Sequence, residues 1–300
     1  MTVMHRAVIA ALALARAPAP AQPAPAGGMV LLARSISPTT PIKIYDPAGS
    51  VRLVGWDRDS VVVTSASRPP GFFALVDRGG IKTGVDQFRF GVEEPRDGAA
   101  ATPYDFVIQV PRQSQLAVKT ASADIDGTDV SGWFYSASGT IRIRGATSTL
   151  DLESIDGSID VNASATWVRA RTGRGRLLVR GAVQDVDAST VGGALDVAAP
   201  SIMRGRFASV TGDIRYAAAP ARGGIFEFSN HSGAVDMALP RDASAALELS
   251  SVTGAIENGF GEARPVSGGA HSMRLILGRG DAQVTVRTFK GTIRLRQAAP

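Results

Sequence analysis

A glycine-centred pattern recurs about ten times along this chain and constrains its fold more than any other feature. The pattern is an apolar–x–apolar triplet, four residues, a glycine, and then x–apolar–x–apolar. The clearest copy is Leu150–Leu152, Gly157 and Ile159–Val161. Further copies centre on Gly49, Gly139, Gly175, Gly193, Gly212, Gly233, Gly254 and Gly291, and Ala123 replaces the glycine once. Self-similarity at a fixed period is typical of stacked-repeat proteins.

Each repeat contains two short segments in which apolar and other residues alternate, which predicts strands with one buried face. Between Gly139 and Gly254 successive glycines are 18 to 21 residues apart. That length suits one coil made of two short strands and two turns. We therefore predict an all-β fold, a single-stranded β-helix or β-solenoid. A β-sandwich or antiparallel meander is the alternative, although neither explains the fixed glycine offset. The glycine is expected at a tight turn that requires positive φ or close backbone approach.

Composition and charge exclude several classes of function. The chain has 300 residues, 44% of them hydrophobic, which is enough for a sizeable core. It has no cysteine, so disulfides, thiolate catalysis and zinc–thiolate sites are impossible. The formal net charge is +5, but the basic residues are interleaved with acids. We expect no nucleic-acid partner, because the sequence shows neither a basic stripe nor aromatic or helical reading elements.

Residues 1–26 are typical of an export signal. A short basic start leads into the apolar run Ala7–Ala15 and a Pro/Ala-rich tract with a candidate cleavage site at Ala19–Ala21. A disordered Ala/Pro-rich leader is the alternative. No segment is long enough to cross a membrane as an apolar helix. We expect an exported protein, located in the periplasm, at the cell surface or outside the cell.

The repeats suggest a simple domain organisation. Residues 27–41 are predicted as a linker or first strand, residues 42–296 as the solenoid, and residues 297–300 as a tail. Residues 66–115 interrupt the pattern, and we expect this excursion to cap the N-terminal end of the stack. The Gly-rich segment 259–271 is predicted as a loop.

The outward positions of the repeats predict two columns of charge. Six residues before the glycine, successive repeats carry Asp151, Arg169, Asp187, Arg206, Glu227 and Glu248. Three residues after it they carry Arg142, Asp160, Leu178, Asp196, Arg215, Asp236 and Glu257. If the coils stack in register, opposite charges meet on neighbouring strands, which stabilises each pair by roughly 0.2–1 kcal/mol. The alternative is solvated strand faces with charges in arbitrary order.

A search for catalytic or metal-binding residues finds no convincing set. His231 lies at a predicted turn and His271 follows a Gly-rich stretch, so both are interpreted as exposed turn residues. We predict no metal site, no cofactor and no catalytic residues. The pairs Asp124/Asp126 and Asp156/Asp160 could in principle serve in polysaccharide cleavage. They are better explained as part of an outward strand face.

Two other features could contact a ligand. Trp133 is at an outward position, where it could be an aromatic platform or pack under the long excursion. Five arginines cluster around the Gly175 turn and could form an edge that binds an anionic glycan or lipid headgroup. They are Arg169, Arg171, Arg174, Arg176 and Arg180. The alternative pairs Arg169 with Asp151 and Asp187.

Several short segments resemble a bacterial putative adhesin domain family, a β-strand-repeat domain of unknown function. They are Gly49–Asp57 followed by Val61–Val63, Phe106–Pro111, Ser138–Ile141, Thr211–Ile214 and Thr288–Ile293. The resemblance covers about residues 42–296. It implies an exported or surface-associated β-helix-like domain with an adhesive role, and it brings no catalytic motif.

Three functions therefore remain. The first is a non-enzymatic envelope or surface protein with an adhesin-like binding or scaffold role. The second is a carbohydrate-active enzyme, a polysaccharide lyase or hydrolase, on a β-helix. The third is a periplasmic partner of an envelope-stress system that binds protein. The partner could be a glycan, an envelope component or a protein.

Overall fold

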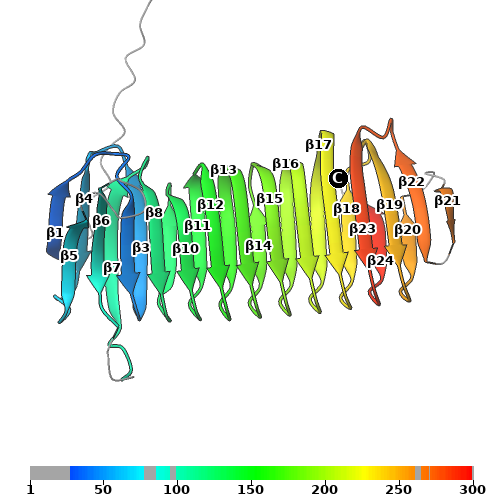
Figure 1. Ribbon diagram of the computed structural model, residues 1–300. Helices are drawn as coiled ribbons and strands as arrows, with labels where there is room; N and C mark the ends of the chain where they lie inside the picture. The colour runs from blue at the N-terminus through cyan, green and yellow to red at the C-terminus, as the bar shows by residue number, and fades with distance from the viewer. Residues whose placement is uncertain (1–27, 78–85, 95–98, 261–264, 270, 299–300) are drawn as a thin grey trace, which may run out of the picture.

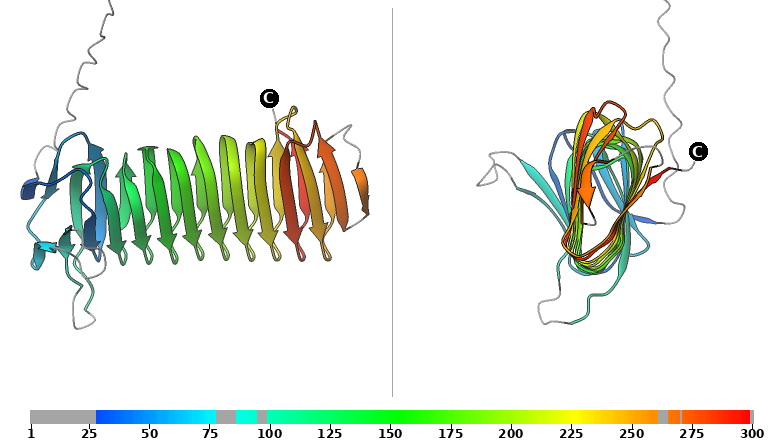
Figure 2. Two further views of the ribbon diagram at one scale, coloured as in Figure 1. Left: turned by 45° about the horizontal axis from the view of Figure 1, so that its top comes forward. Right: turned by 90° about the vertical axis from the view of Figure 1, so that its right-hand side faces the viewer.

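The computed structural model describes residues 28–77, 86–94, 99–260, 265–269 and 271–298, so the predicted export signal lies outside the described residues. In this part of the chain there are twenty-four strands and no helix. The strands stack side by side into a straight rod (Figure 1). The end-on view shows the central coils superposed as a flattened ring (Figure 2). Nothing in the described chain forms a helix long and apolar enough to cross a membrane.

One long side of the rod, face 1, is built from the strands that precede each repeat glycine. In stacking order these are β5 (Phe72–Asp77), β6 (Gln87–Val92), β2 (Ile42–Asp46), β8 (Gln115–Thr120), β10 (Ser131–Ser136), β12 (Thr149–Ser154), the second half of β13 (Ile159–Thr172), β15 (Val183–Thr190), the second halves of β16 (Leu195–Ser209) and β17 (Ile214–Asn230), β23 (Ala282–Thr288), β19 (Ala245–Ser251), β22 (Ser272–Leu277) and β21 (Pro265–Gly269). All neighbours from β6 to β19 are parallel.

The opposite side, face 2, is built from the strands that follow the glycine. In stacking order these are β1 (Met29–Ser35), β4 (Ser60–Ser65), β7 (Tyr104–Pro111), β3 (Gly49–Trp56), β9 (Asp124–Thr128), β11 (Ile141–Ala146), the first half of β13, β14 (Leu177–Arg180), the first halves of β16 and β17, β18 (Val235–Leu239), β24 (Ile293–Gln297) and β20 (Ile256–Gly259). The core is the double layer of inward side chains between the two faces.

The parallel register confirms the solenoid and contradicts the sandwich and meander alternatives. Leu150 lies opposite Val168, which lies opposite Val186, one coil further along the rod each time. All three side chains are buried. An antiparallel meander would pair consecutive strands in opposite directions, whereas antiparallel pairs occur here only towards the two ends of the rod.

The repeat glycines are required by close backbone approach. A Cβ on Gly175 would overlap the carbonyl oxygen of Gly157, and a Cβ on Gly193 would overlap that of Gly175. Neither glycine has a positive φ. The tight turns therefore stack against one another along one edge of the rod, which we call the turn edge and which is the lower edge in Figure 1.

A buried ladder of hydroxyl and amide side chains supports these turns, and the sequence analysis did not anticipate it. Its members are three residues before each glycine or Ala123: Thr120, Ser136, Ser154, Thr172, Thr190, Ser209, Asn230, Ser251 and Thr288. Thr172 Oγ1 donates to the carbonyl oxygen of Gly157 at 2.9 Å. Thr190 Oγ1 accepts from the Gly193 N–H at 3.0 Å. The first bond joins neighbouring coils and the second closes the turn within one coil, and both satisfy buried backbone groups.

Both ends of the stack depart from chain order. At the C-terminal end, the last coil, β23–β24, inserts between β17–β18 and β19–β20. At the N-terminal end, β2–β3 lies between β6–β7 and β8–β9. The excursion 66–115 therefore supplies the coil β6–β7 and the antiparallel strand β5. The prediction of a loop at 259–271 was wrong over residues 265–269, which form β21 against β22.

The two predicted charge columns are present. Asp151, Arg169, Asp187, Arg206 and Glu227 follow one another across face 1. In the face 2 column, Asp196 pairs with Arg215 at 3.3 Å. The inserted C-terminal coil adds two members. Thr285 lies between Glu227 and Glu248, and Arg294 lies between Asp236 and Glu257. The insertion thus separates like charges that consecutive order would place together.

Candidate functional site

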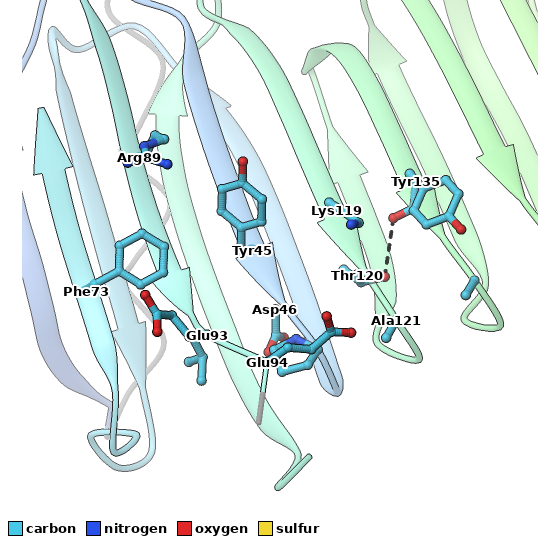
Figure 3. A pocket seen from close by; sticks show the side chains of 13 residues that line it. Tyr45, Asp46, Phe73, Arg89, Glu93, Glu94, Lys119, Thr120, Ala121 and Tyr135 are labelled. Carbon is cyan, nitrogen blue, oxygen red and sulfur yellow. Dashed lines mark hydrogen bonds between the residues drawn. The ribbon is translucent and has the colours of Figure 1, made fainter. Parts of the chain in front are cut away.

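A cleft of about 610 Å³ opens on face 1 near the N-terminal end, across β5, β6, β2, β8 and β10. We call it the N-terminal cleft. Its walls include Tyr45, Phe73, Lys119 and Tyr135, and Asp46 lines it where β2 ends. Figure 3 shows these side chains on their strands.

The strand register places the cleft residues in one row across the rod. Phe73 lies opposite Gly91, and Gly91 lies opposite Tyr45. Tyr45 lies opposite Lys119, and Lys119 lies opposite Tyr135. Neighbouring strands are about 4.8 Å apart, so the row from Phe73 to Tyr135 is about 19 Å long. An extended ligand could contact several of these side chains at once.

Gly91 sets the shape of one end of the row. Its φ is +143°, and a Cβ there would overlap the carbonyl oxygen of Tyr45. With no side chain at this position, the rings of Phe73 and Tyr45 approach to 6.3 Å between centroids, tilted by 39°. At the other end Tyr135 stacks on Trp133 at 5.8 Å and 15°. Trp133 is therefore held against the cleft wall by an aromatic neighbour.

Asp46 takes the place in the buried ladder that a hydroxyl residue or Asn230 holds in other coils. It lies opposite Thr120 in the strand register. It is 1% exposed, and neither carboxyl oxygen has a hydrogen-bond partner. Burial raises the pKa of Asp46 to about 7. The nearby Ala48 amide, outside hydrogen-bond geometry, opposes this rise in part, and the charge of Asp105 adds to it. A buried carboxyl without partners is costly. Of the other ladder side chains, only the Ser209 hydroxyl also lacks a partner among the described residues, and it carries no ionisable group.

The charged groups around the cleft have both signs. Arg89 Nε lies 2.7 Å from Asp77 Oδ2, so its charge is compensated within the protein. Lys119 is exposed and forms no salt bridge among the described residues. Glu93 and Glu94 are exposed and also line the cleft. The cleft therefore offers donors, acceptors and aromatic surface together with charges of both signs. Apolar walls with a few polar groups are typical of small-molecule sites.

The five arginines predicted as a polyanion-binding edge are all in ion pairs and are divided between three parts of the rod. Arg169 Nε donates to Asp151 Oδ1 at 2.8 Å, and Arg171 lies 4.0 Å from Asp187, both on face 1. Arg174 pairs with Asp156 at the turn edge at 3.3 Å. On face 2, Arg176 pairs with Asp196 at 2.8 Å and Arg180 with Asp160 at 3.0 Å. Arg169 thus pairs as the alternative interpretation predicted, with Asp151.

The candidate carboxylates for polysaccharide cleavage are also paired with arginine. Arg142 Nη1 lies 3.5 Å from Asp124 and 3.7 Å from Asp126. Asp156 and Asp160 pair with Arg174 and Arg180 respectively.

The two histidines that the structure describes have structural contacts. His231 stacks on Phe289 at 5.0 Å, and His271 Nδ1 is 2.9 Å from the Gly254 carbonyl oxygen. Within the described ranges no three potential metal ligands gather.

A family model described as Toastrack DUF4097 matches residues 104–296, which is more than half of the chain. The chain belongs to the Toastrack DUF4097 family. This confirms the resemblance seen in the sequence. The opening motif Gly49–Asp57, which contributed to that resemblance, lies before the matched residues. No curated protein matches the chain.

Three solved structures are similar to this Toastrack chain at low sequence identity. A protein of Parabacteroides distasonis, described as a putative lipid binding protein, is 12% identical, with a TM-score of 0.54 over 90% of this chain and 97% of its own. A putative adhesin of Bacteroides fragilis is 9% identical, with a TM-score of 0.42 over 88% and 96%. A putative cell adhesion protein of Clostridium sporogenes is 8% identical, with a TM-score of 0.29 over 90% and 99%.

Tyr45, Lys119 and Tyr135 of this Toastrack protein were not predicted as a group. They share the outward position four residues before the glycine or Ala123, so their common position in the repeat is the signal that identifies them. Asp46 was not predicted either, although an acid at a position otherwise occupied by Ser, Thr or Asn stands out among the repeats.

Proposed function

We propose that this Toastrack protein is an exported, non-enzymatic protein of the cell envelope or surface with an adhesin-like role, and that it binds a neutral glycan in the N-terminal cleft. The observation that carries the proposal is the register row of Phe73, Tyr45, Lys119 and Tyr135. Aromatic rings offer flat apolar surface to the C–H faces of sugar rings, and the polar groups between them bond to hydroxyls.

The charges of the cleft favour a neutral, polyhydroxylated ligand over an ionic one. Lys119 supplies donors, Glu94 supplies acceptors, and Arg89 is already compensated by Asp77. A strongly anionic or cationic ligand would meet a group of like charge in the same cleft. A sugar chain uses donors and acceptors together and places no net charge beside the buried Asp46.

Export and the absence of catalysis complete the proposal. Residues 1–26 support export by their basic start, apolar run and small-residue cleavage site. The absence of a reaction is supported by the ion pairs of Asp124, Asp126, Asp156 and Asp160, because carboxylates held by arginine are poorly suited to proton transfer.

The proposal is tested by screening the purified chain against an array of neutral and acidic oligosaccharides. Binding to a neutral glycan is expected. Tyr135→Ala should weaken it at least tenfold, because the aromatic surface at one end of the row is removed, and Lys119→Ala should weaken it severalfold. Trp167→Ala, which removes an outward ring outside the cleft, is the matched control and should bind like the parent protein.

Two results would contradict this assignment. One is an array without any neutral-glycan signal. The other is binding to acidic glycans that survives Tyr135→Ala and is lost in the Arg174→Glu/Arg176→Glu variant, which would move the site to the arginines around the Gly175 turn.

A further inference from the structure

A row of exposed, mostly apolar residues runs along the turn edge and begins one coil beyond Ala137, which lines the N-terminal cleft. Its members stand two residues before each glycine. In stacking order they are Ile155, Gly173, Val191, Val210, His231, Phe289 and Val252. We call this row the turn-edge ridge. Its aliphatic members remain 45% to 59% exposed, and Phe289 is 42% exposed. With strands about 4.8 Å apart, the ridge is about 29 Å long.

The apolar character is specific to the ridge position, since the neighbouring turn position is polar or small. One residue further along the chain lie Asp156, Arg174, Gly192, Thr211, Ser232, Lys290 and Thr253. Backbone hydrogen bonds between adjacent turns hold the ridge members in register. The Thr211 N–H donates to the Val191 carbonyl at 2.8 Å, and the Ser232 N–H donates to that of Val210 at 2.9 Å. Contiguous exposed apolar surface of this kind marks interaction sites in soluble proteins.

A shallow groove of about 610 Å³ lies beside the ridge on face 1. Its floor in the central coils is made of small side chains, Ser189, Ala208 and Ser229. On β15, β16 and β17 this flank therefore carries no large side chain beside Val191 and Val210; Arg171 lies one coil away on β13.

Charges on this flank differ between the two ends of the ridge. Next to Ile155 are Glu153 on β12 and Asp156 in the turn that follows it. Next to Phe289 are Arg287 on β23 and Lys290 in the turn that follows it. Among the described residues, Glu153, Arg287 and Lys290 form no salt bridge, although Glu153 affects Arg169 through longer-range electrostatics. At these two positions the coils between the ends carry uncharged residues, except for Arg171 on β13 and Arg174 in the turn that follows it.

We propose that the turn-edge ridge is the interface of an antiparallel homodimer, with a two-fold axis that crosses the turn edge between β15 and β16. In such an isologous interface, when one residue of the first copy contacts a second residue of the other copy, the reverse contact also forms. Val191 of one copy faces Val210 of the other. The acidic β12 end faces the basic β23 end, so Glu153 meets Arg287 and Asp156 meets Lys290, twice per dimer.

This placement of the axis is the one that the side chains favour. His231 comes opposite Gly173, where the missing side chain leaves space for the ring. Arg171 and Arg174 come opposite Ser229 and Ser232, so no like charges oppose each other. Moving the axis by half a coil, onto β16, would set Arg171 against Arg287.

The test is a charge exchange measured by sedimentation equilibrium on the full chain. The parent protein should be dimeric. Glu153→Arg and Arg287→Glu should each raise the dimer dissociation constant about tenfold, and the double variant should return close to the parent value. Within one chain these residues are five coils, about 24 Å, apart, so only contact between two copies explains mutual rescue. Arg144→Glu, an exposed change on face 2, is the matched control and should leave the dimer unchanged.

A second variant, Val191→Ser/Val210→Ser, should give a folded monomer, verified by an unchanged far-ultraviolet circular dichroism spectrum. A parent chain that is monomeric throughout the micromolar range would overturn the proposal, as would a dimer without rescue in the double variant. A monomer that binds phosphatidylglycerol vesicles through Val191 and Val210 would also overturn it and assign the ridge to a lipid surface.

Discussion

The central coils and the N-terminal end use the same repeat positions for different purposes. Three residues before the glycine, the centre has Thr172, whose hydroxyl bonds to the neighbouring coil, whereas β2 has Asp46 without any partner. Four residues before the glycine or Ala123, the centre has Arg171, which lies 4.0 Å from Asp187, whereas the N-terminal end has Tyr45, Lys119 and Tyr135 around a cleft. Repetition therefore maintains register in the centre, and departures from it create a surface for recognition at the end.

The largest effect on stability is expected from adding a side chain to a turn glycine of the central coils. Gly193→Ala should lower the free energy of unfolding by roughly 2–3 kcal/mol or more, because its Cβ would overlap the Gly175 carbonyl and the coils would have to separate. Urea unfolding monitored by circular dichroism measures the change.

The adjacent Gly192→Ala is the matched control for this experiment. The nearest atom to its Cβ would be Thr211 Oγ1 at 3.6 Å, an ordinary contact. Its stability should stay within about 0.5 kcal/mol of the parent. Equal effects of the two substitutions would show that close approach is not the reason for the conserved spacing of the turn glycine within this chain.

The second prediction concerns pH and sharpens the contrast between Asp46 and the rest of the ladder. Because burial raises the pKa of Asp46 from 3.8 to about 7, the folded state binds a proton that the unfolded state releases above pH 4. Stability should therefore fall as pH rises from about 4 to 7 and stay low above that range.

Asp46→Thr restores the side-chain type found in Thr120 and Thr172, and it should remove this loss. We expect its melting temperature to exceed that of the parent at pH 8 and the difference to shrink at pH 4.5, as measured by differential scanning calorimetry. A parent and variant whose melting temperatures stay parallel over this range would show that Asp46 does not titrate between these limits.

The smallest effect compares one paired and one unpaired outward cation. Arg169→Ala should destabilise the central coils by about 0.5–1 kcal/mol, because a partly exposed pair with Asp151 is lost. Lys119→Ala should change stability by less than about 0.3 kcal/mol, since exposed residues away from specific interactions have small effects. Chemical denaturation of both variants under one set of conditions measures the difference. A larger loss for Lys119→Ala would give the cleft a structural role.

Much of the fold could be predicted from the sequence because its repeat is local. The triplets around Leu150–Leu152 and Ile159–Val161 reveal strands, and the distance between glycines reveals coil length. The charge columns were also predictable, since stacking in register follows from equal repeats. The cleft was not predicted, because it depends on β5 and β6, which come from the irregular excursion 66–115 and carry no repeat signal.

By itself, the sequence determined the coil, the buried positions, the turn glycines and the alternating charges, all of which depend on residues within about twenty positions of each other. Only the tertiary structure decided the order of the coils at the ends. Chain order would set Asp236 beside Glu257 and Glu227 beside Glu248. The structure inserts β23–β24 between them, so Arg294 and Thr285 separate those acids. This order avoids placing like charges opposite each other on neighbouring strands, which is unfavourable, because a basic or neutral residue lies between them. These charges are set by the sequence, but only contacts between segments distant in the chain bring them together.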